Sequence, residues 1–479
     1  MGAREDVIAV CANGQKFLAP EALEYILSND KPVELINTVL KHLMAGKLFI
    51  EKQDVVGVLV GDTYNEPCKS IAPKNKHVSE LSVIKGTDVS GNSTSTGKVD
   101  DFAKFFKNRY LSLSRLIESH PSFGKATPIE ASKKYDRDDI KIVGMVYSCK
   151  ETKNGHKLIQ IEDLSGMSSA MILKSSPLIN EIIVEDEVIG FTGRWNTEKT
   201  LFMVKRITRP DIPKSSKWEP IDTSSKMLCL SDIHIGSDTF LQKDWDRMMD
   251  WLKHNQDQNV QYIILPGDVV DGIGVYPDQE EELNITDIYE QYNTLSEYLK
   301  DIPDDIKMVL HPGNHDACRI AEPQPALASV FTKSFDSNII LTSNPVSLNV
   351  EGRIVSTYHG KGMDDWVAKV KGLSYDKPNE IMKQMLIRRH FAPMYGSKNA
   401  LVPEPKDYLV MENIPDLVIT GHIHKASLGM YNGVRMINAS TFQDQTSYQK
   451  MHNFIPTPGR VPIVSLADGD ISLIDFHKV

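Results

Sequence analysis

The organisation of this 479-residue chain depends on the stretch Cys229-Leu-Ser-Asp-Ile-His-Ile-Gly236. The apolar residues before Ser231 predict the end of a buried strand, and Asp232 and His234 follow directly. Residues two apart on an extended segment point to the same side, so both side chains can reach one metal ion. An Asp-x-His pair alone is more often a polar loop than a metal site, so its meaning depends on the rest of the chain.

Four further stretches place metal-ligating side chains directly after a short apolar run. In an α/β fold, functional groups gather at the carboxyl ends of strands, so these side chains are expected to converge. The glycines beside them let the backbone turn sharply. The stretches are Gly267-Asp268 after Tyr262–Leu265, Gly313-Asn314-His315-Asp316 after Met308–Leu310, His359-Gly360 after Ile354–Val355, and Gly421-His422-Ile-His424 after Leu417–Thr420.

From about residue 225 to its end, the chain alternates apolar strands with helical patterns. This alternation predicts a layered α/β domain with sheets inside. The predicted helices include Trp245–His254 and Tyr289–Lys300. The predicted strands are Met227–Leu230, Tyr262–Leu265, Met308–Leu310, Ile339–Leu341, Ile354–Tyr358, Leu417–Thr420, Arg435–Asn438 and Ile463–Leu466.

The ligand candidates comprise Asp, His and Asn without Cys, a donor set that suits divalent metals such as Mn, Fe or Zn. Seven candidates exceed one tetrahedral site and fit two ions bridged by a shared carboxylate. Two such ions hold phosphate oxygens, lower the pKa of the bridging water and stabilise in-line displacement. Separate buried histidines and turn aspartates would explain any one stretch, but five together at strand ends disfavour that interpretation.

Composition narrows the class of protein. With 41% hydrophobic residues the chain can bury a large core, and its length indicates two to four domains. A formal net charge of -10 disfavours a chain that grips nucleic acid over its whole surface, but it allows local basic grooves. The five scattered cysteines without Cys-x-x-Cys indicate a reducing, cytoplasmic location. No apolar run reaches ~20 residues, so membrane insertion is not expected.

Residues 1–75 predict a small helical module, with helices that begin at Pro20 and Pro32 and a hairpin over 49–60. Helices followed by a hairpin are typical of a winged-helix DNA binder or of a docking module. The sequence contains no basic recognition helix there, which favours docking. Residues 76–100 form a predicted flexible linker, because Gly86–Lys98 is almost devoid of apolar residues.

Residues 101–215 predict a helix followed by an OB-fold. The aromatic stripe of the helix begins at Phe102, and five strands follow, with a short helix over 178–184 between the third and fourth. OB-folds bind single strands or dock proteins. Mixed charge and few free aromatic residues favour docking. The predicted strands are Ile140–Tyr147, Leu158–Leu164, Ser168–Leu173, Glu187–Trp195 and Leu201–Ile207.

The motifs after residue 225 resemble the calcineurin-like metallophosphoesterase superfamily, whose signature is Asp-x-His, Gly-Asp, Gly-Asn-His-(Asp/Glu), a lone His and Gly-His-x-His. All five parts stand in order in this chain. The resemblance implies an α/β/β/α sandwich over 225–479. It implies that His315 donates a proton or hydrogen bond at the leaving side of the phosphate and that Asp316 orients His315. It also implies one ion on Asp232, His234, Asp268 and His424, and another on Asp268, Asn314, His359 and His422.

An OB-fold joined to such a domain is similar to the B-subunits of replicative polymerases. Four runs resemble the small subunits of archaeal family D DNA polymerases more closely: 312–325, 372–378, 388–390 and 458–462. Lys361-Gly362 departs from the Arg-Ser expected after the His-Gly pair. Neither residue is a ligand, so the departure affects the expected phosphate contacts and leaves the ligand set complete.

This second resemblance implies a metal-dependent 3′-5′ exonuclease that proofreads within a heterodimer with a large catalytic polymerase subunit. The expected cofactors are two divalent ions, Mn²⁺ first, with Fe, Zn or Mg as alternatives. The expected substrate is single-stranded DNA or a primer 3′ end, with a sliding clamp reached through the complex, at the replication machinery of the nucleoid. A scaffold subunit and a stand-alone metallophosphatase are the alternative functions.

Overall fold

The computed structural model divides the chain into two compact units, residues 1–77 and 78–479. It describes residues 81–478 apart from 215 and 255–257, and in the first unit residues 20–42 together with 4, 7, 10, 11, 17, 18, 49, 50 and 55. Helices α2 (Pro20–Leu27) and α3 (Pro32–His42) begin at the two prolines. Strand β2 (Phe49–Ile50) pairs in parallel with β1 (Phe17–Leu18). The rest of the predicted hairpin, apart from Val55, lies outside the described residues.

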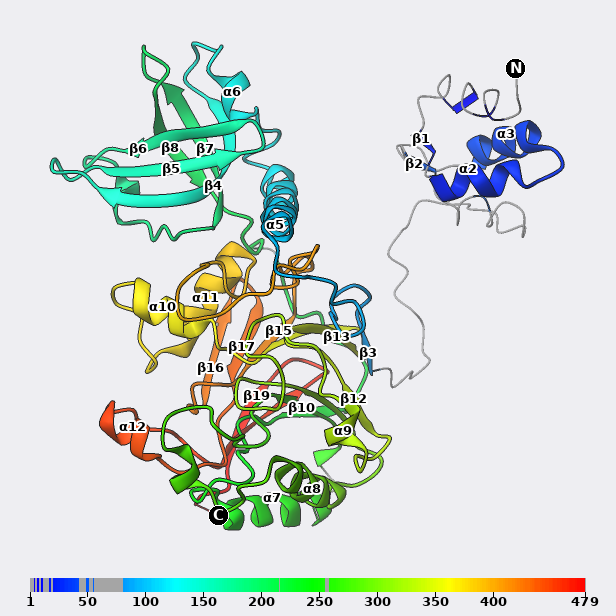
Figure 1. Cartoon of the computed structure of the whole chain (residues 1–479), viewed down its shortest axis with the longest axis vertical. Coiled ribbons are helices and arrows are strands. Elements are labelled where there is room, and N and C mark those ends of the chain that lie inside the picture. The colour runs from blue at the N-terminus through cyan, green and yellow to red at the C-terminus, as the bar shows by residue number, and fades with distance from the viewer. Residues whose placement is uncertain are drawn as a thin grey trace. The chain divides into compact units, whose positions relative to one another are not determined.

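Five strands close into a barrel in the order β4-β5-β6-β8-β7, which Figure 1 shows next to helix α5 (Val99–Ser119). The third strand pairs in parallel with the fifth, and the 3-10 helix η1 (Pro177–Asn180) lies between the third and fourth, where the sequence predicts a helix. Phe191 and Phe202 fill the barrel interior, and α6 (Ile129–Ser132) adds Ile129 to that core. The strands are β4 (Ile140–Glu151), β5 (Lys157–Asp163), β6 (Gly166–Ile172), β7 (Val188–Trp195) and β8 (Leu201–Thr208).

The rest of the second unit is built on two six-stranded sheets. The first has the order β12-β11-β10-β9-β18-β19, and its strands β9 to β12 run parallel to one another. It comprises β9 (Lys226–Cys229), β10 (Val260–Pro266), β11 (Lys307–His311), β12 (Ile339–Leu341), β18 (Arg460–Ser465) and β19 (Ile471–Asp475). The second has the order β16-β17-β15-β14-β13-β3, with β14, β15 and β17 parallel. It comprises β3 (Leu81–Val83), β13 (Val346–Val350), β14 (Arg353–Tyr358), β15 (Leu417–Thr420), β16 (Ser427–Tyr431) and β17 (Val434–Asn438).

Helices cover the outer face of each sheet, and the inner faces pack against each other. Trp245 and Tyr292 of the first helical layer are buried on the first sheet, and Trp366 is buried on the second. Between the sheets, Ile264 and Ile419 belong to a separate apolar core. The region therefore has the α/β/β/α layers that the family resemblance implies. The helices are α7 (Gln242–His254), α8 (Ile288–Lys300), α9 (Ser329–Thr332), α10 (Met363–Lys369), α11 (Pro378–Arg388) and α12 (Ser447–Met451), with the 3-10 helix η3 (Gln279–Glu282).

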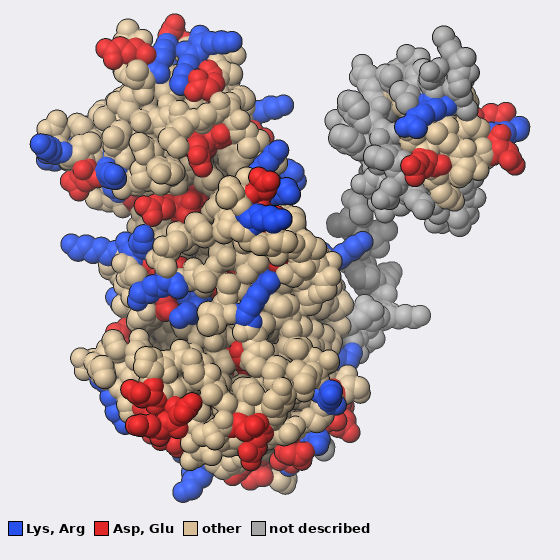
Figure 2. Space-filling model, viewed as in Figure 1, with Lys and Arg blue, Asp and Glu red and all other residues tan. Residues whose placement is uncertain are grey.

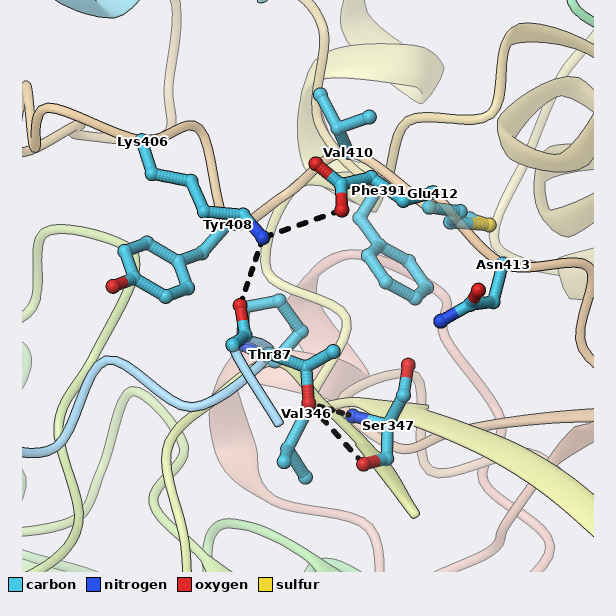
Figure 3. A pocket seen from close by; sticks show the side chains of 12 residues that line it. Thr87, Val346, Ser347, Phe391, Lys406, Tyr408, Val410, Glu412 and Asn413 are labelled. Atoms are coloured by element: carbon cyan, nitrogen blue, oxygen red, sulfur yellow. Dashed lines mark hydrogen bonds and ion pairs between the residues drawn. The ribbon is translucent and has the colours of Figure 1, made fainter. Parts of the chain in front are cut away.

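Residues 81–98, called the strap below, are fixed to the second sheet, which corrects the flexible linker predicted over 76–100 for this part of it. Strand β3 pairs antiparallel with β13, and Val89 is fully buried. Lys406 Nζ donates to the Gly86 carbonyl oxygen at 2.8 Å. Figure 3 shows this junction as a pocket lined by the start of the strap, by β13 and by residues 406–413, with Thr87 next to Ser347.

The far half of the strap is held by one carboxylate. Glu404, which is buried, accepts hydrogen bonds from Ser93 Oγ at 2.5 Å, Thr94 N at 2.9 Å and Ser95 N at 3.1 Å. Arg319 donates to the same carboxylate at 3.2 Å. The linker prediction failed because it counted apolar burial alone, whereas these polar residues are ordered by a hydrogen-bond acceptor about 310 positions away in the sequence.

The barrel is joined to the sandwich by buried ion pairs. Arg109 of α5 donates to Asp407 Oδ2 at 2.7 Å, and His390 Nε2 lies 2.9 Å from the same oxygen. Arg388 of α11 lies 2.8 Å from the Glu187 carboxylate, which precedes β7. All five side chains are buried. Because breaking a buried pair costs about 3–5 kcal/mol, these contacts fix the barrel on the sandwich.

The part of the chain that the structure describes contains no helix with the length and apolar character needed to cross a membrane.

Candidate metal centre

The five loops that carry the candidate ligands meet at one edge of the sandwich. Three of them follow β9, β10 and β11, which are parallel neighbours, so their carboxyl ends lie at the same edge. The other two follow β14 and β15, which are parallel neighbours in the second sheet. A hydrogen bond from His422 N to Asp232 Oδ2, 2.9 Å long, joins the loops of the two sheets. The structure therefore brings the predicted side chains together from both sheets.

The first group of ligand atoms belongs to Asp232, His234 and His424, all three buried, with the atoms within 4.8 Å of one another. The two imidazole atoms His234 Nε2 and His424 Nε2 lie 3.1 Å apart. Asp232 Oδ1 lies 3.3 Å from His424 Nε2 and 3.9 Å from His234 Nε2. Two nitrogens and a carboxylate oxygen thus face one small volume, as the ligands of a single cation do.

The second group belongs to Asp268, His359 and His422, again with ligand atoms within 4.8 Å of one another. His359 Nε2 lies 3.2 Å from Asp268 Oδ2 and 3.0 Å from Asn314 Oδ1. His422 Nε2 lies 3.1 Å from Asp364 Oδ1, which leaves its Nδ1 available to an ion. Asn314 therefore joins the group through its amide oxygen.

Asp268 connects the two groups. Its Oδ2 lies 3.2 Å from His359 Nε2 and 4.0 Å from His234 Nε2. A carboxylate placed between two sets of imidazoles can be shared by two ions. Nitrogen and oxygen donors without Cys suit Mn, Fe or Zn, so the residues present fit the divalent ions expected from the sequence. Which ligand serves which ion remains a prediction.

Further side chains orient the ligand imidazoles. Asp271 Oδ1 lies 2.8 Å from His234 Nδ1, and the Pro266 carbonyl oxygen lies 2.8 Å from His359 Nδ1. Gln449 Nε2 lies 3.0 Å from His424 Nδ1. The two acceptors, the Asp271 carboxylate and the Pro266 carbonyl, fix ring orientation and raise ligand basicity. Gln449 Nε2 can only donate, so it fixes the orientation of the His424 ring alone. Asp271, Gln449 and Asp364 were not predicted from the sequence. Asp271 could have been found from the sequence as an Asp three residues after a candidate ligand. No sequence feature marks Gln449 or Asp364.

Five of the seven candidate ligands have left-handed backbone conformations. The φ angles are 52° at Asp232, 55° at His234, 49° at Asp268, 69° at His422 and 52° at His424. A non-glycine residue in this region costs about 1–3 kcal/mol, and such residues cluster at functional sites where the surroundings hold them. The concentration of strained positions on the ligand set indicates that this edge of the sandwich is organised for function.

Two glycines make room for the ligand carboxylates. A Cβ atom added at Gly313 would lie 2.2 Å from Asp268 Oδ1, and one added at Gly421 would lie 2.5 Å from Asp232 Oδ2. Both distances are far below van der Waals contact, so any larger residue would displace a ligand. The glycines of the Gly-Asn-His and Gly-His-x-His stretches are therefore required by close approach of the backbone to the site.

Burial and charge set the protonation states of the centre. Burial lowers the pKa of His234 and of His422, so both imidazoles are neutral at pH 7 and keep a free lone pair. Burial alone would raise the pKa of Asp268, but His359 and His315 hold it well below its usual range. The linking carboxylate is therefore ionised, as a metal ligand must be.

His315 lies next to the ligand groups. Its ring centroid is 4.7 Å from that of His234, and the residue is half-buried. His315 Nδ1 lies 2.8 Å from the Asp271 carbonyl oxygen. Because a carbonyl oxygen can only accept, Nδ1 carries a hydrogen and Nε2 is free to exchange a proton with a substrate. This arrangement is compatible with the acid role expected for His315.

The Asp316 carboxylate and the His315 imidazole make their hydrogen bonds with other partners, which argues against the orienting role expected for Asp316. The Asp316 carboxylate accepts hydrogen bonds from Gly313 N at 2.8 Å and from the Tyr292 hydroxyl at 3.1 Å. Burial raises the pKa of Asp316 to about 6. Asp316 therefore anchors the loop that carries Asn314 and His315, and the Asp271 carbonyl is the group that orients His315.

Comparisons with known proteins identify the family of this chain. Residues 227–427 match the family of B-subunits of DNA polymerases alpha and epsilon. The chain is 42% identical over 386 residues to the DNA polymerase II small subunit of Thermoplasma acidophilum, which covers 79% of this chain and 78% of that protein. It is 38% identical over 462 residues to the DNA polymerase II small subunit of Archaeoglobus fulgidus, covering 93% and 92%. The chain belongs to the family of DNA polymerase II small subunits, which confirms the resemblance seen in its sequence.

Proposed function

We propose that this chain is the small subunit of a two-subunit DNA polymerase and that it removes nucleotides from DNA 3′ ends by metal-dependent phosphodiester hydrolysis. The observation that supports this most is the convergence of seven ligand side chains from five loops around Asp268. A subunit that served only as a scaffold would have no need for strained backbone at five of those ligands. The names of the relatives support a large catalytic subunit as the partner.

The chain's own residues divide the chemical work. Asp232, His234, Asp268, Asn314, His359, His422 and His424 would hold two divalent ions, Mn²⁺ being the first candidate. Ions held there would polarise a phosphodiester and lower the pKa of an attacking water. As an imidazolium, His315 would deliver its Nε2 proton to the leaving oxygen and become neutral, while its Nδ1–H stays on the Asp271 carbonyl. Asp271 also holds His234 through its carboxylate, so it positions a ligand and the proton donor together.

Charge on the surface supports local, weak attraction to DNA. The face in Figure 2 shows Lys and Arg side chains at the level of α10 and α11, and Asp and Glu side chains gathered over the lower part. Three exposed lysines, Lys369, Lys371 and Lys377, lie in this region. DNA affinity normally depends on clustered Lys and Arg, and this chain carries a net charge of -10. The large subunit would therefore supply much of the DNA affinity.

The first test is digestion of a 3′-end-labelled single strand by the isolated chain with Mn²⁺, with and without EDTA. We expect the wild type to release label only when metal is free to bind. His315→Ala should slow release by about 10²–10⁴-fold, the usual contribution of a general acid, while elemental analysis shows unchanged metal content. His254→Ala, an exposed histidine on α7, is the matched control and should behave as the wild type. Undiminished cleavage by His315→Ala would reject its role.

The second test separates the nuclease from its alternatives. The chain is a scaffold if it associates with the large polymerase chain but releases no label with Mn, Fe, Zn or Mg. A chain that hydrolyses p-nitrophenyl phosphate far faster than DNA is a stand-alone phosphatase. Titration of single-stranded DNA at matched salt should show tighter binding by the two-subunit complex than by the isolated chain. Equal affinities would favour a self-sufficient nuclease.

A further inference from the structure

Helix α12 is attached to the first ligand group by its inward side chain. Gln449 Nε2 lies 3.0 Å from Nδ1 of the ligand candidate His424. The same side chain closes the N-terminal cap of the helix, because Gln449 Oε1 accepts from Thr446 N at 3.3 Å and Thr446 Oγ1 accepts from Gln449 N at 3.2 Å. The Gln449 carbonyl accepts from Phe454 N at 2.9 Å. The position of the helix is therefore coupled to that of a ligand.

A second contact joins the segment after α12 to the other ligand group. The Phe454 ring packs edge-on against Tyr375, with centroids 6.2 Å apart. The Tyr375 hydroxyl donates to Asp364 Oδ1 at 2.9 Å, and this oxygen also lies 3.1 Å from His422 Nε2. Residues 446–455 are called the platform below. They contact the first ligand group directly through Gln449 and are linked to the second through Tyr375 and Asp364. Figure 1 shows α12 projecting from the sandwich.

The outward side of the platform carries stacked and exposed rings. Tyr448 and His452 lie with ring centroids 4.3 Å apart and planes tilted by 35°. His452 Nδ1 donates to the Tyr448 carbonyl oxygen at 2.9 Å, which fixes the imidazole and leaves its Nε2 free. The exposed fraction is 59% for Tyr448 and 79% for Met451. A surface of this kind offers flat apolar faces to a ligand without first having to be ordered.

We propose that the platform binds the terminal bases of the single strand that the metal centre cleaves, with Tyr448 as the stacking residue and His452 supporting it. This inference rests on the proposed nuclease function and adds how the substrate is recognised. Tyr448 is one Cα step, about 3.8 Å, from Gln449, whose side chain reaches His424. On this proposal, a strand end whose phosphodiester lies at the ligand groups extends along α12, and its bases reach the outward ring pair. Stacking tolerates every base because each has a π face, as proofreading requires.

The exposed ring pair also gives a reason for a preference for unpaired ends. A base can stack on Tyr448 only after it has left its own partner in the duplex, and a mismatched terminal base does so at lower cost. The platform would thus favour a frayed or mismatched 3′ end over a paired one. Loss of one stacked base should lower the affinity or the cleavage rate about 5- to 150-fold.

The experiment measures release of 3′ label from three DNAs by the full chain with Mn²⁺: an ordinary single strand, the same strand with its last two bases missing, and a duplex whose 3′ end is paired. We expect the wild type to cleave the base-free end about 5- to 150-fold more slowly than the ordinary one, and to cleave the paired end more slowly as well. Tyr448→Ala should cleave the ordinary strand at the slow rate of the base-free one, while its rate on the base-free strand stays unchanged. Tyr448→Phe should retain the wild-type preference.

The matched control is Tyr289→Ala, which removes a tyrosine of similar exposure, 51%, from helix α8. It should retain the wild-type preference for bases. Equal slowing of both single strands by Tyr448→Ala would overturn the proposal, because the residue would then act on the metal groups and not on bases. Unchanged cleavage by Tyr448→Ala, with loss of the large subunit instead, would overturn it in favour of a protein contact.

Failure of the proposed function has a different signature. If the wild type releases no label from any of the DNAs, the proposed hydrolysis is rejected. Fluorescence anisotropy of the ordinary and base-free strands then still tests whether the platform binds bases. The wild type should then bind the ordinary strand more tightly, and Tyr448→Ala should bind both equally. Equal binding of both strands by the wild type would overturn the proposal that the platform binds bases.

Discussion

Replacing Glu404 by Gln tests whether the strap is ordered by one carboxylate. The two backbone amides of Thr94 and Ser95, the Ser93 hydroxyl and Arg319 all donate to this buried side chain. An amide of the same shape presents one donor where the carboxylate presents acceptors only. At least one of the four donors therefore loses its partner, and the remaining bonds lose their ionic character.

The magnitude follows from the number of bonds. A hydrogen bond to a charged group contributes about 1.5–3 kcal/mol and a neutral one about 0.5–1.5 kcal/mol. A difference of about 1 kcal/mol for each of the three bonds from Ser93, Thr94 and Ser95 gives about 3 kcal/mol, before any loss from Arg319. Since each 1.4 kcal/mol is a factor of ten, the strap should open about 100-fold more often in Glu404→Gln.

Hydrogen exchange of the strap amides, read by mass spectrometry, measures this local opening. We expect amides of residues 86–98 to be protected in the wild type and to exchange about 100-fold faster in Glu404→Gln. Glu412→Gln is the matched control, because Glu412 is exposed and pairs with Lys406 at 3.4 Å, a contact worth about 0–1 kcal/mol. If the strap amides of the wild type exchange as fast as those of an unstructured peptide, the reasoning is refuted and the predicted flexible linker is correct.

Three further outcomes are expected. Asp268→Asn should reduce the content of both ions together in elemental analysis, since the neutral amide removes charge from both ligand groups. Asp271→Asn should weaken metal affinity about 10- to 100-fold in a competition titration, because His234 loses its carboxylate partner. Burial raises the pKa of Glu322 to about 7, from an ordinary value of 4.5. The stability it contributes is therefore fully present below pH 4.5 and is lost as pH rises through 7. Denaturant unfolding should be measured for both proteins at pH 5 and pH 8. The free energy of unfolding of Glu322→Gln should rise relative to that of the wild type between the lower and the higher pH.

Strands that are buried on both sides were predictable from the sequence because their apolar runs are unbroken. All eight strands predicted after residue 225 are present, and β10 and β15 lie at the positions expected. Strand β16 was missed because its side chains are only half-buried or exposed. Strand β3 has three residues, and its hydrogen-bond partner β13 lies about 270 positions away in the sequence. No local pattern could therefore reveal it.

The ligand candidates were predictable because each stands directly after a strand and carries a distinctive side chain. Their partners were not. Asp364 lies in helix α10, and its role depends on the approach of His422 from a different strand end. Gln449 is one of many glutamines, and only the fold places it against His424. Residues that act through another residue leave no mark in the sequence unless their spacing is fixed by one element.

Asp271 shows why this matters for the chemistry. Its carboxylate holds His234 at 2.8 Å and its carbonyl oxygen holds His315 at 2.8 Å. The proposed ligand His234 is held by the side chain of Asp271 and the proposed proton donor His315 by its backbone, so Asp271→Asn alters the first contact and retains the second. The loop after β10 carries Asp268 and Asp271 together, and it therefore places the linking carboxylate, one ligand ring and the donor ring in a single rigid turn. If the proposed roles hold, a displacement of that turn would disturb metal binding and proton transfer at once, a coupling that a scaffold subunit would not need.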